Sequence, residues 1–527
     1  MLQVIHGYPP SGASPSIPPS PAHRLSSPVA ADGVLHFRPS PIRRMPSMKF
    51  LDLNNDVLAL ILSFVRPPDA IQLALTCHDA YSVAMPRFLS DVVLGGEDSS
   101  LSGPDQMTLF CKYMLADVRG RLRHLRILDV QEGAFVSISE KDGLEIWKDD
   151  YSCALIFADM LSQAVSLRKL HIRDLESLLQ TQPAVADAFT KLEYLRDLSF
   201  SYVGKETLAM LKRTICRPFR LEFGLWKDGS ARVKGDTESF DHYASSLKQL
   251  NLWKCACLLE SLSDQYVSPG VRVLGLGGRV PLLSTISREF PNVRTITFAP
   301  ECSIEEEAPK PVWSSLDYVD TSSPLPYFSC AVRHLELRYV LGAALVRFSR
   351  AQVIARTVEL LRQTSPVVLS CVIEATLAGD VLDRMVSVIP RLRFLELVTS
   401  ADESHARDNS DDIMSWMNEH VPRFGKIPLV GLSLYGSTSL GHGGGSTFDA
   451  NTVLAIARRA AMHVPSLKYI GVGLTSRNDN FQDTRGDAVW FRVKMRIDGR
   501  EPILDMLSNG KGESVECELR ALDRVTP

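Results

Sequence analysis

A short apolar pattern recurs along most of this 527-residue chain. In each copy the first, fourth and sixth residues are apolar, as in Leu125-x-x-Leu128-x-Val130. Other copies begin at Leu167, Leu195, Leu247, Val271, Val293, Val332, Leu392, Leu429 and Leu467, with weaker ones at 221–223 and 368–373. The closest successive copies are 28, 24 and 22 residues apart, which is the length of one unit in many repeat proteins. The pattern predicts a series of short strands in similar surroundings.

Helical patterns lie between these strands. Spaced apolar residues occur at 151–164, 205–215, 282–290, 351–363, 380–389, 411–419 and 451–463. Pro291, Pro390 and Pro465 follow three of these segments, where proline ends a helix. Parallel strands need long, right-handed connections of this kind. We therefore expect an α/β fold. Its repeats should form a solenoid, in which the strands make a curved parallel sheet and the helices lie on the convex side. The alternative is a general α/β domain with leucine-rich strands.

The segment at residues 50–89 has a different pattern. A helical stripe of apolar residues is formed there by Leu53, Val57, Leu58, Ile61, Leu62 and Val65. Asn54 or Asn55 is suited to cap the helix, and Asp56 lies in the first turn, where the helix dipole favours a negative charge. Forty residues are too few to bury a core alone. We expect this segment to pack against the neighbouring domain, a partner, or both.

Prolines divide the same segment into short helices. We expect Pro67 and Pro68 to stop the first helix and a second to begin at Asp69. A third is expected from about Asp79 to Ala84, ended by Pro86. The sequence therefore predicts a small helical domain with two or three helices.

These residues resemble an F-box. The order Leu53-x-x-Asp56-Val57-Leu58-x-x-Ile61-Leu62-x-x-Val65, followed by Pro68-Asp69-Ala70 and Leu73-Ala74-Leu75-Thr76-Cys77-x-x-x-Tyr81, is similar to that family's pattern. Asn54 stands where the family usually has proline, and Tyr81 stands near the expected tryptophan. An F-box followed by irregular leucine-rich repeats is a known family arrangement, and the tail of this chain resembles fungal members.

The resemblance implies a function without catalysis. F-box proteins bind a Skp-type adaptor, and through it a cullin, as substrate-recognition subunits of a ubiquitin ligase. The implied adaptor-binding residues are Leu53, Val57, Leu58, Ile61, Leu62, Val65, Leu73 and Leu75. The alternative is a leucine-rich scaffold in which this helical hairpin only caps the solenoid.

The repeats would then bind an unknown target protein. Side chains alternate between the two faces of a strand, so residues between the apolar positions face the concave surface. The expected contact residues are Lys169, His171, Arg173, Gln249, Asn251, Trp253, His334, Glu336, Arg338, Phe394, Glu396, Tyr435 and Tyr469.

Four regions follow from these patterns. Residues 1–48 are rich in proline and serine and are expected to be a disordered lead, with Met48 as a possible alternative start. Residues 49–93 form the F-box-like domain, 94–480 the repeats, and 481–527 a C-terminal cap and tail. Alternation at 490–497 followed by Asp498-Gly499 predicts a strand or hairpin that covers the last repeat.

Composition excludes several partners. The net charge is −3, with 58 basic and 61 acidic residues, so no nucleic acid and no anionic membrane is expected as a partner. No apolar run approaches the ~18 residues of a membrane span. The ten cysteines lack framework spacing, which indicates free thiols and a cytoplasmic or nuclear location.

Motifs for enzyme chemistry are weak. No P-loop or paired zinc motif occurs, so no cofactor, metal or catalytic residue is expected. Cys255 and Cys257 form a tight pair that would need two further ligands to hold zinc. The glycine loop after His442 resembles an esterase oxyanion loop, but the nucleophile elbow that a hydrolase would need is missing.

Overall fold

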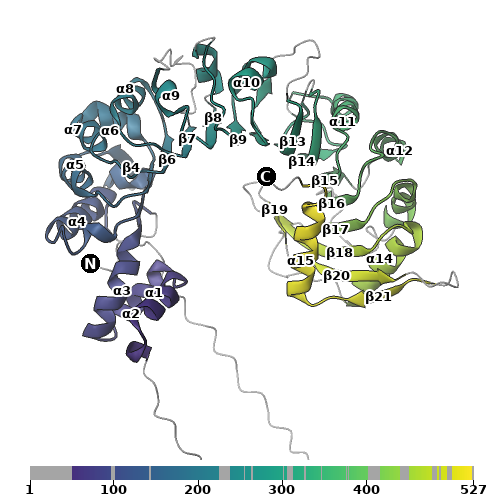
Figure 1. Cartoon of the computed structure of the whole chain (residues 1–527), viewed down its shortest axis with the longest axis horizontal. Helices are drawn as coiled ribbons and strands as arrows, with labels where there is room; N and C mark the ends of the chain where they lie inside the picture. The colour runs from purple at the N-terminus through teal and green to yellow at the C-terminus, as the bar shows by residue number, and fades with distance from the viewer. Residues whose placement is uncertain are drawn as a thin grey trace, which may run out of the picture. The chain divides into compact units, whose positions relative to one another are not determined.

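The computed structural model describes two compact units. The described residues are 50–524, with gaps at 97–100, 142–143, 225–237, 255, 263–264, 301, 305–312, 326–327, 346, 375–376, 378, 401–415, 439–449, 478–482, 486–487 and 495–500. The first unit contains the described residues up to Ser199 together with 213–216, and the second contains 200–212 and the residues from Arg217 onward. Each unit combines helices with strands of a largely parallel sheet (Figure 1). The proline-rich lead 1–48 lies outside the described residues.

The first unit begins with helices and continues with alternating strands and helices. Its α-helices are α1 (Asn55–Ser63), α2 (Pro67–Ala74), α3 (His78–Ser90), α4 (Gly103–Leu115), α5 (Ala154–Gln163), α6 (Leu175–Thr181) and α7 (Ala184–Phe189). Its 3-10 helices are η2 (Phe50–Asp52), η3 (Leu122–His124) and η4 (Glu132–Phe135). Its strands are β1 (Asp91–Leu94), β2 (Ile127–Val130), β3 (Val136–Lys141), β4 (Leu144–Asp149) and β5 (Lys169–Ile172), and the chain leaves the unit within β6 (Asp197–Ser201).

Helix α1 begins as the sequence predicts. The side chain of Asn54 caps it by accepting a hydrogen bond from the backbone N–H of Asp56, at 3.0 Å. The helix ends at Ser63, before the prolines. Pro67 and Pro68 are instead the first residues of α2, so the prediction that this helix starts at Asp69 is wrong by two residues. The first turn of a helix tolerates proline because its N–H groups have no partner within the helix.

Helix α3 is longer than predicted. It runs through Pro86 to Ser90, so the expectation that this proline ends the helix is wrong. A proline inside a helix costs about 3 kcal/mol. Phe88 and Leu89, which follow it, are almost fully buried, and their packing offsets that cost.

Parallel strands connect the three N-terminal helices to the rest of the first unit. Strand β1 pairs with β2, and β2 pairs with β5, both in parallel. Burial alternates along β1, β2 and β5, which places Leu128 and Leu170 in the core. Helix α3 leads directly into β1 and also contacts η3. Helix α3 therefore packs against the first strands, and α1 and α2 pack against α3.

The second unit contains a curved sheet of parallel strands (Figure 1). Each strand pairs in parallel with the next one in its order. In that order they are β7 (Arg220–Gly224), β8 (Gln249–Trp253), β9 (Val273–Leu276), β11 (Thr295–Phe298), β13 (Ser315–Thr321), β14 (Ala331–Leu341), β15 (Val368–Glu374), β16 (Phe394–Ser400), β17 (Gly431–Thr438) and β18 (Tyr469–Arg477). The repeating apolar pattern, its weaker copies included, predicts all of these strands except β13. A separate two-stranded pair is formed by β10 (Arg279–Val280) and β12 (Ser303–Ile304).

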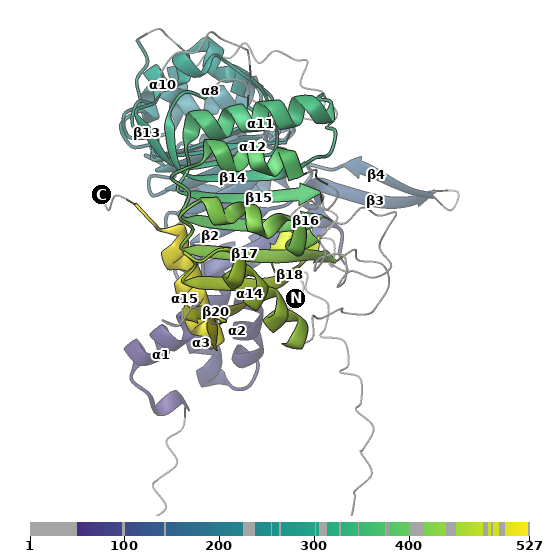
Figure 2. The same ribbon diagram turned by 90° about the vertical axis from the view of Figure 1, so that its right-hand side faces the viewer.

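Helices cover one face of this sheet. They are α8 (Lys205–Arg213), α9 (Glu238–Tyr243), η5 (Ala256–Ser261), α10 (Leu283–Glu289), α11 (Arg350–Thr364), α12 (Gly379–Val388), η7 (Val421–Lys426) and α14 (Ala450–His463). Figure 2 shows α11, α12 and α14 in front of β14–β18. Helices α10, α12 and α14 end before Pro291, Pro390 and Pro465, as predicted.

The C-terminal segment covers part of the opposite face. Strand β20 (Val489–Lys494) pairs antiparallel with β18, and β21 (Ile503–Met506) pairs antiparallel with β20. The predicted strand and hairpin are confirmed, although the turn at Asp498-Gly499 lies outside the described residues. A short strand, β19 (Asp483–Arg485), also pairs with β18. Helix α15 (Asn509–Arg520), which the sequence did not predict, lies on the other side of β16–β18 from α12 and α14 (Figure 1).

The described cysteines are free thiols, as predicted. Cys77 and Cys517 are exposed, whereas Cys302, Cys330 and Cys371 are buried. Burial raises the pKa of each of these three buried thiols to about 12. Cys255, and with it the Cys255–Cys257 pair, lies outside the described residues.

We expect thiol alkylation to follow this division. The thiolate is the reactive form, so a raised pKa and burial both slow the reaction at pH about 8. Mass-spectrometric mapping should find Cys77 and Cys517 modified in the native chain, and Cys302, Cys330 and Cys371 modified only after addition of guanidinium. Equal rates for Cys371 and Cys77 in the native chain would contradict the described burial.

Candidate functional site

Two surfaces of the chain carry the residues that the sequence predicted to bind partners. The first is on α1, in the first unit. The second is the face of the sheet in the second unit that lies opposite its helices. In the part of the chain that the structure describes, no group of three or more His, Cys, Asp or Glu side chains is placed to hold a metal ion. The loop after His442 lies outside the described residues.

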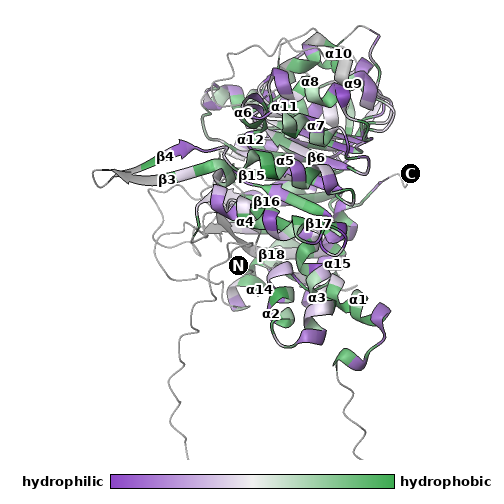
Figure 3. Ribbon diagram, turned by 90° about the vertical axis from the view of Figure 1, so that its left-hand side faces the viewer, coloured by the Kyte–Doolittle hydropathy of each residue, from purple (hydrophilic) through white to green (hydrophobic). Residues whose placement is uncertain are grey.

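Helix α1 has an exposed apolar face. Val57, Leu60, Ile61 and Phe64 are 43%, 61%, 37% and 82% exposed. Their spacing of three and four residues places them on one side of the helix. Figure 3 shows the hydrophobic residues of α1 in green. We call Val57, Leu60, Ile61 and Phe64 the α1 face.

The predicted adaptor-binding residues separate into three groups. Val57, Ile61 and Leu75 are exposed. Leu53, Val65 and Leu73 are half-buried. Leu58 and Leu62 are 2% and 4% exposed, because they face the interior of the helical segment, so the structure does not leave these two open to a partner. Helix α1 therefore uses one apolar face for its own fold and leaves another uncovered.

Sequence reasoning missed two members of the α1 face. Leu60 and Phe64 lie outside the single stripe that was predicted, although they are more exposed than Val57 and Ile61. A second apolar face could have been predicted from the composition of the helix. Its sequence, NDVLALILS, contains more apolar residues than one side of a helix can hold. A helix with apolar residues on more than one side is expected to be covered on more than one side.

Two of the three predicted contact residues of the first unit lie close to carboxylates. His171 Nδ1 lies 3.0 Å from Asp129 Oδ1, and Lys169 Nζ lies 3.8 Å from Asp197 Oδ2. Arg173, at the end of the same strand, is exposed. These side chains are on one face of β5, as the alternation predicts.

A polar cluster occupies the start of the sheet in the second unit. Glu222 on β7 accepts hydrogen bonds from Arg220, at 2.8 Å, and from Asn251, at 3.0 Å. Burial would raise the pKa of the Glu222 carboxyl, but these hydrogen bonds lower it below its ordinary value. Asn251 is 5% exposed and therefore not open to a partner, whereas Gln249 and Trp253 are half-buried.

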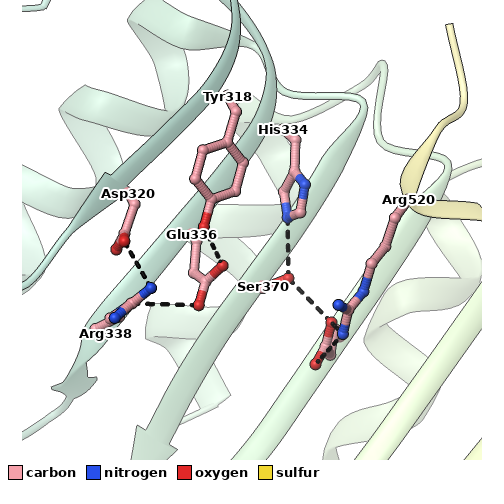
Figure 4. A network of polar contacts seen from close by, with 8 residues as sticks. Tyr318, Asp320, His334, Glu336, Arg338, Ser370 and Arg520 are labelled. Atoms are coloured by element: carbon pink, nitrogen blue, oxygen red, sulfur yellow. Dashed lines mark hydrogen bonds and ion pairs between the residues drawn. The ribbon is translucent and has the colours of Figure 1, made fainter. Parts of the chain in front are cut away.

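A polar network crosses the middle of the same face (Figure 4). Tyr318 on β13 donates a hydrogen bond to Glu336 Oε2 on β14, at 2.5 Å. Arg338 Nη2 lies 2.7 Å from Asp320 Oδ2 and its Nε lies 3.4 Å from Glu336 Oε1. Burial alone would lower the pKa of Arg338, but the carboxylates of Asp320 and Glu336 raise it above its ordinary value. The guanidinium is half exposed and remains charged.

The network continues to the C-terminal helix. His334 and Ser370 lie 3.2 Å apart, and the hydroxyl of Ser370 donates to Glu396 Oε2 at 3.1 Å. Arg520 of α15 donates to both oxygens of Glu396, at 3.2 and 3.0 Å (Figure 4). Burial would lower the pKa of Arg520, but Glu396 and Glu516 raise it.

Several predicted contact residues are buried, and the C-terminal segment packs against two of them, Phe394 and Glu396. Phe394, Glu396, Tyr435 and His334 are 0%, 1%, 2% and 6% exposed, so the expectation that they are open on the concave face is wrong. One apolar cluster joins Val367, Val368 and Phe394 of the sheet to Trp490 of β20 and Leu519 of α15, with the half-buried Tyr469 packed against it. Sequence alternation identified the correct face but could not reveal what covers it.

Gly431 on β17 shows how closely α15 approaches the sheet. A Cβ atom at Gly431 would lie 2.6 Å from Leu519 Cδ1 and 2.9 Å from Phe394 Cδ2. Only glycine leaves room for the helix there. We call the face of β7–β14, which carries the half-exposed predicted contact residues Gln249, Trp253, Glu336 and Arg338, the open part of this face.

Comparison with known proteins gives no identification. No protein-family model matches the chain, and no curated protein matches its sequence. None of the helices in the described ranges combines the length and the apolar composition needed to cross a bilayer.

Proposed function

We propose that this chain is the substrate-recognition subunit of a Skp–cullin–F-box ubiquitin ligase. In this proposal residues 50–90 are an F-box that binds a Skp-type adaptor, and the strands that follow are irregular leucine-rich repeats that bind a target protein. The resemblance of Leu53–Tyr81 to the F-box pattern supports the assignment. The α1 face is the observation that carries it, because its apolar side chains are exposed while the opposite side of the helix is buried.

The chemistry of the α1 face suits helix-in-groove recognition. Anchors spaced at three and four residues insert into an apolar groove of the partner. Fully burying a side chain such as Ile61 or Phe64 contributes about 1.5–3 kcal/mol. The exposed Leu75 and the half-buried Leu53 extend the apolar surface beside the α1 face. Together they form the proposed adaptor contact.

The target would bind the open part of the sheet face in the second unit. Trp253 and Arg338 are the strongest candidates, because aromatic and arginine side chains dominate protein interfaces. Trp253 lies over Gly275, where a Cβ would meet its Cη2 at 2.8 Å. The half-exposed guanidinium of Arg338 is positioned by two carboxylates.

A scaffold function is the second candidate. Helix α3 contacts β1 and η3, so the N-terminal helices do close one end of the first strands. A cap of this kind accounts for the buried Phe88 and Leu89 of α3. It does not account for the exposed α1 face.

Co-elution separates the two candidates. A purified full-length chain is expected to co-elute with a purified Skp-type adaptor on size exclusion, and an affinity pull-down from a cell extract is expected to recover adaptor and cullin. A chain that folds but elutes alone at micromolar concentrations of both proteins would favour the scaffold.

A further inference from the structure

Basic residues form a row along the edge where the strands of the second unit begin. Lys248, Arg272 and Arg294 each precede β8, β9 or β11 by one residue, and all three are exposed. The backbone N–H of Arg272 donates to the carbonyl of Lys248 at 2.8 Å, and that of Arg294 donates to the carbonyl of Arg272 at 2.9 Å. The three residues are therefore direct neighbours on adjacent strands. We call Lys248, Arg272 and Arg294 the basic ladder.

The side chains of the basic ladder are directed along the edge. Arg272 Nη1 donates to the carbonyl of Asn292 in the next turn, at 2.7 Å, and Arg294 Nη1 lies 3.5 Å from Oγ of Ser315, the first residue of β13. Lys248 Nζ lies 3.5 Å from where a Cβ at Gly270 would be. Each cation thus reaches toward the beginning of the following strand.

Acidic groups do not neutralise this row. Within the described ranges, no carboxylate lies within 4.0 Å of the charged nitrogen atoms of Lys248, Arg272 or Arg294. The turns that precede these strands, at 244–246, 268–270 and 290–292, contain no acidic residue. Asp317 occupies the corresponding position on the next strand, β13, and ends the row of positive charge.

The same position carries arginine in the first unit. Arg126, Arg168 and Arg196 precede β2, β5 and β6 and are exposed. Backbone hydrogen bonds of 2.8 and 2.7 Å link Arg168 to Arg126 and Arg196 to Arg168. Burial lowers the pKa of the neighbouring His124, and the positive charges of Arg123 and Arg126 lower it further. Three successive cations therefore recur in each unit, at the same place in the strand repeat.

We propose that the basic ladder binds an acidic polypeptide segment in extended conformation. Adjacent strands are about 4.8 Å apart, so the three cations span about 10 Å. An extended peptide places same-side residues about 6.7 Å apart, and flexible lysine and arginine side chains can adjust to that spacing. Two or three acidic residues of one segment therefore match the ladder, and Asp317 repels a segment that continues past it.

A single-stranded nucleic acid fits this edge less well. Such ligands need aromatic side chains between the cations for base stacking. The turns beside the ladder contain alanine, serine, proline, glycine, asparagine and the fully buried Phe290, and the exposed Phe219 lies one strand before Lys248. One aromatic at the end of the row cannot stack successive bases. Adaptor binding by α1 plays no part in this interaction.

Photo-crosslinking tests the basic ladder directly. The probe is a short oligoglutamate peptide with a terminal benzophenone, mixed with the full-length chain at low ionic strength, and adducts are mapped by mass spectrometry. We expect adducts in the turns at 244–248, 268–272 and 291–294, and a loss of adducts as salt screens the charges. The variant K248E/R272E/R294E is expected to lose them at least about tenfold.

Matched controls make the result decisive. R384E/R458E/K511E changes the net charge equally on exposed residues of α12, α14 and α15 and is expected to keep the adducts. The arginine-bearing turns before β2, β5 and β6 are also expected to be labelled, and they should keep their adducts in the ladder variant, because the first unit is unchanged. Adducts that lie outside both rows of cations, that persist at 244–248, 268–272 and 291–294 in the ladder variant, or that oligothymidylate displaces more strongly than unlabelled oligoglutamate would overturn the proposal. Each of these outcomes is independent of co-elution with the adaptor.

Discussion

Removing residues 508–527 is expected to lower the free energy of unfolding of the second unit by about 5 kcal/mol, because two kinds of buried contact are lost together. Leu519 is 3% exposed and packs with Phe394 and Trp490. Deleting such a side chain costs about 2–5 kcal/mol. Arg520 is the ion-pair partner of Glu396, which is 1% exposed. Leaving a buried carboxylate without its partner costs about 3 kcal/mol or more.

Denaturant unfolding of truncated and full-length chains measures this effect. Because the two contributions are neighbours, their energies do not simply add. A fall in Tm of about 10 °C is expected for a unit of this size. The variant L519D should reproduce most of it, whereas K511A, on an exposed residue of the same helix, should change little.

A rescue variant separates the ion pair from the packing. Arg520→Met removes the guanidinium and keeps much of the side-chain volume. Glu396→Gln in the same chain then removes the unpaired charge, and stability is expected to recover in part. Truncation without loss of stability would show that α15 is not held on the sheet as described.

If α1 binds the adaptor as we propose, the variant I61D/F64D is expected to lose that binding, and this is the second large effect. Both residues belong to the α1 face, and each is expected to cost at least about 2 kcal/mol as an interface anchor. A combined loss of about 4 kcal/mol weakens binding about a thousandfold. The fold should remain intact, because neither side chain is buried in the chain's own core.

The matched control is L155D/V165D. Leu155 and Val165 are 62% and 57% exposed in the same unit, so the variant makes the same chemical change away from α1. Titration calorimetry should show adaptor affinity unchanged in the control and lost in I61D/F64D. Equal binding by both variants would remove the α1 face from the adaptor contact. Leu62 is unsuitable for this test, since it is 4% exposed and its substitution would unfold the helices.

The strands of the sheet could be predicted because their apolar residues have a fixed spacing. Leu274, Ile296 and Leu335 are fully buried in adjacent or nearby strands, and each is the fourth residue of a copy. Strand β13 was missed because Thr321 replaces the apolar sixth residue after Leu316 and Val319. Thr321 is nevertheless buried, and its hydroxyl donates to the carbonyl of Ser323 at 2.6 Å. A polar residue whose hydroxyl has a hydrogen-bond acceptor nearby can therefore occupy a core position at which the pattern expects an apolar residue.

The C-terminal helix could not be predicted from its own sequence. Its segment NGKGESVECELR has two glycines and few apolar residues, and only Gly512 and Leu519 are buried. Contacts with distant residues hold it, among them Glu396 and the Trp490 ring beside Gly512. The hairpin of β3 and β4 was missed for a similar reason, because its exposed Ile138, Ile146 and Trp147 do not mark a buried face. Elements that are exposed, or that are held in place by contacts with distant residues, do not show a regular spacing of apolar residues in their own sequence.

The most direct test of the central claim is covalent footprinting of α1. The full-length chain is modified by photogenerated carbenes with and without a Skp-type adaptor, and the labelled positions are mapped by mass spectrometry. We predict that the adaptor protects residues 57–64 strongly and leaves labelling at the exposed Met462 of α14 unchanged. Equal labelling of residues 57–64 with and without a saturating adaptor would contradict the proposal that this helix is the adaptor-binding surface.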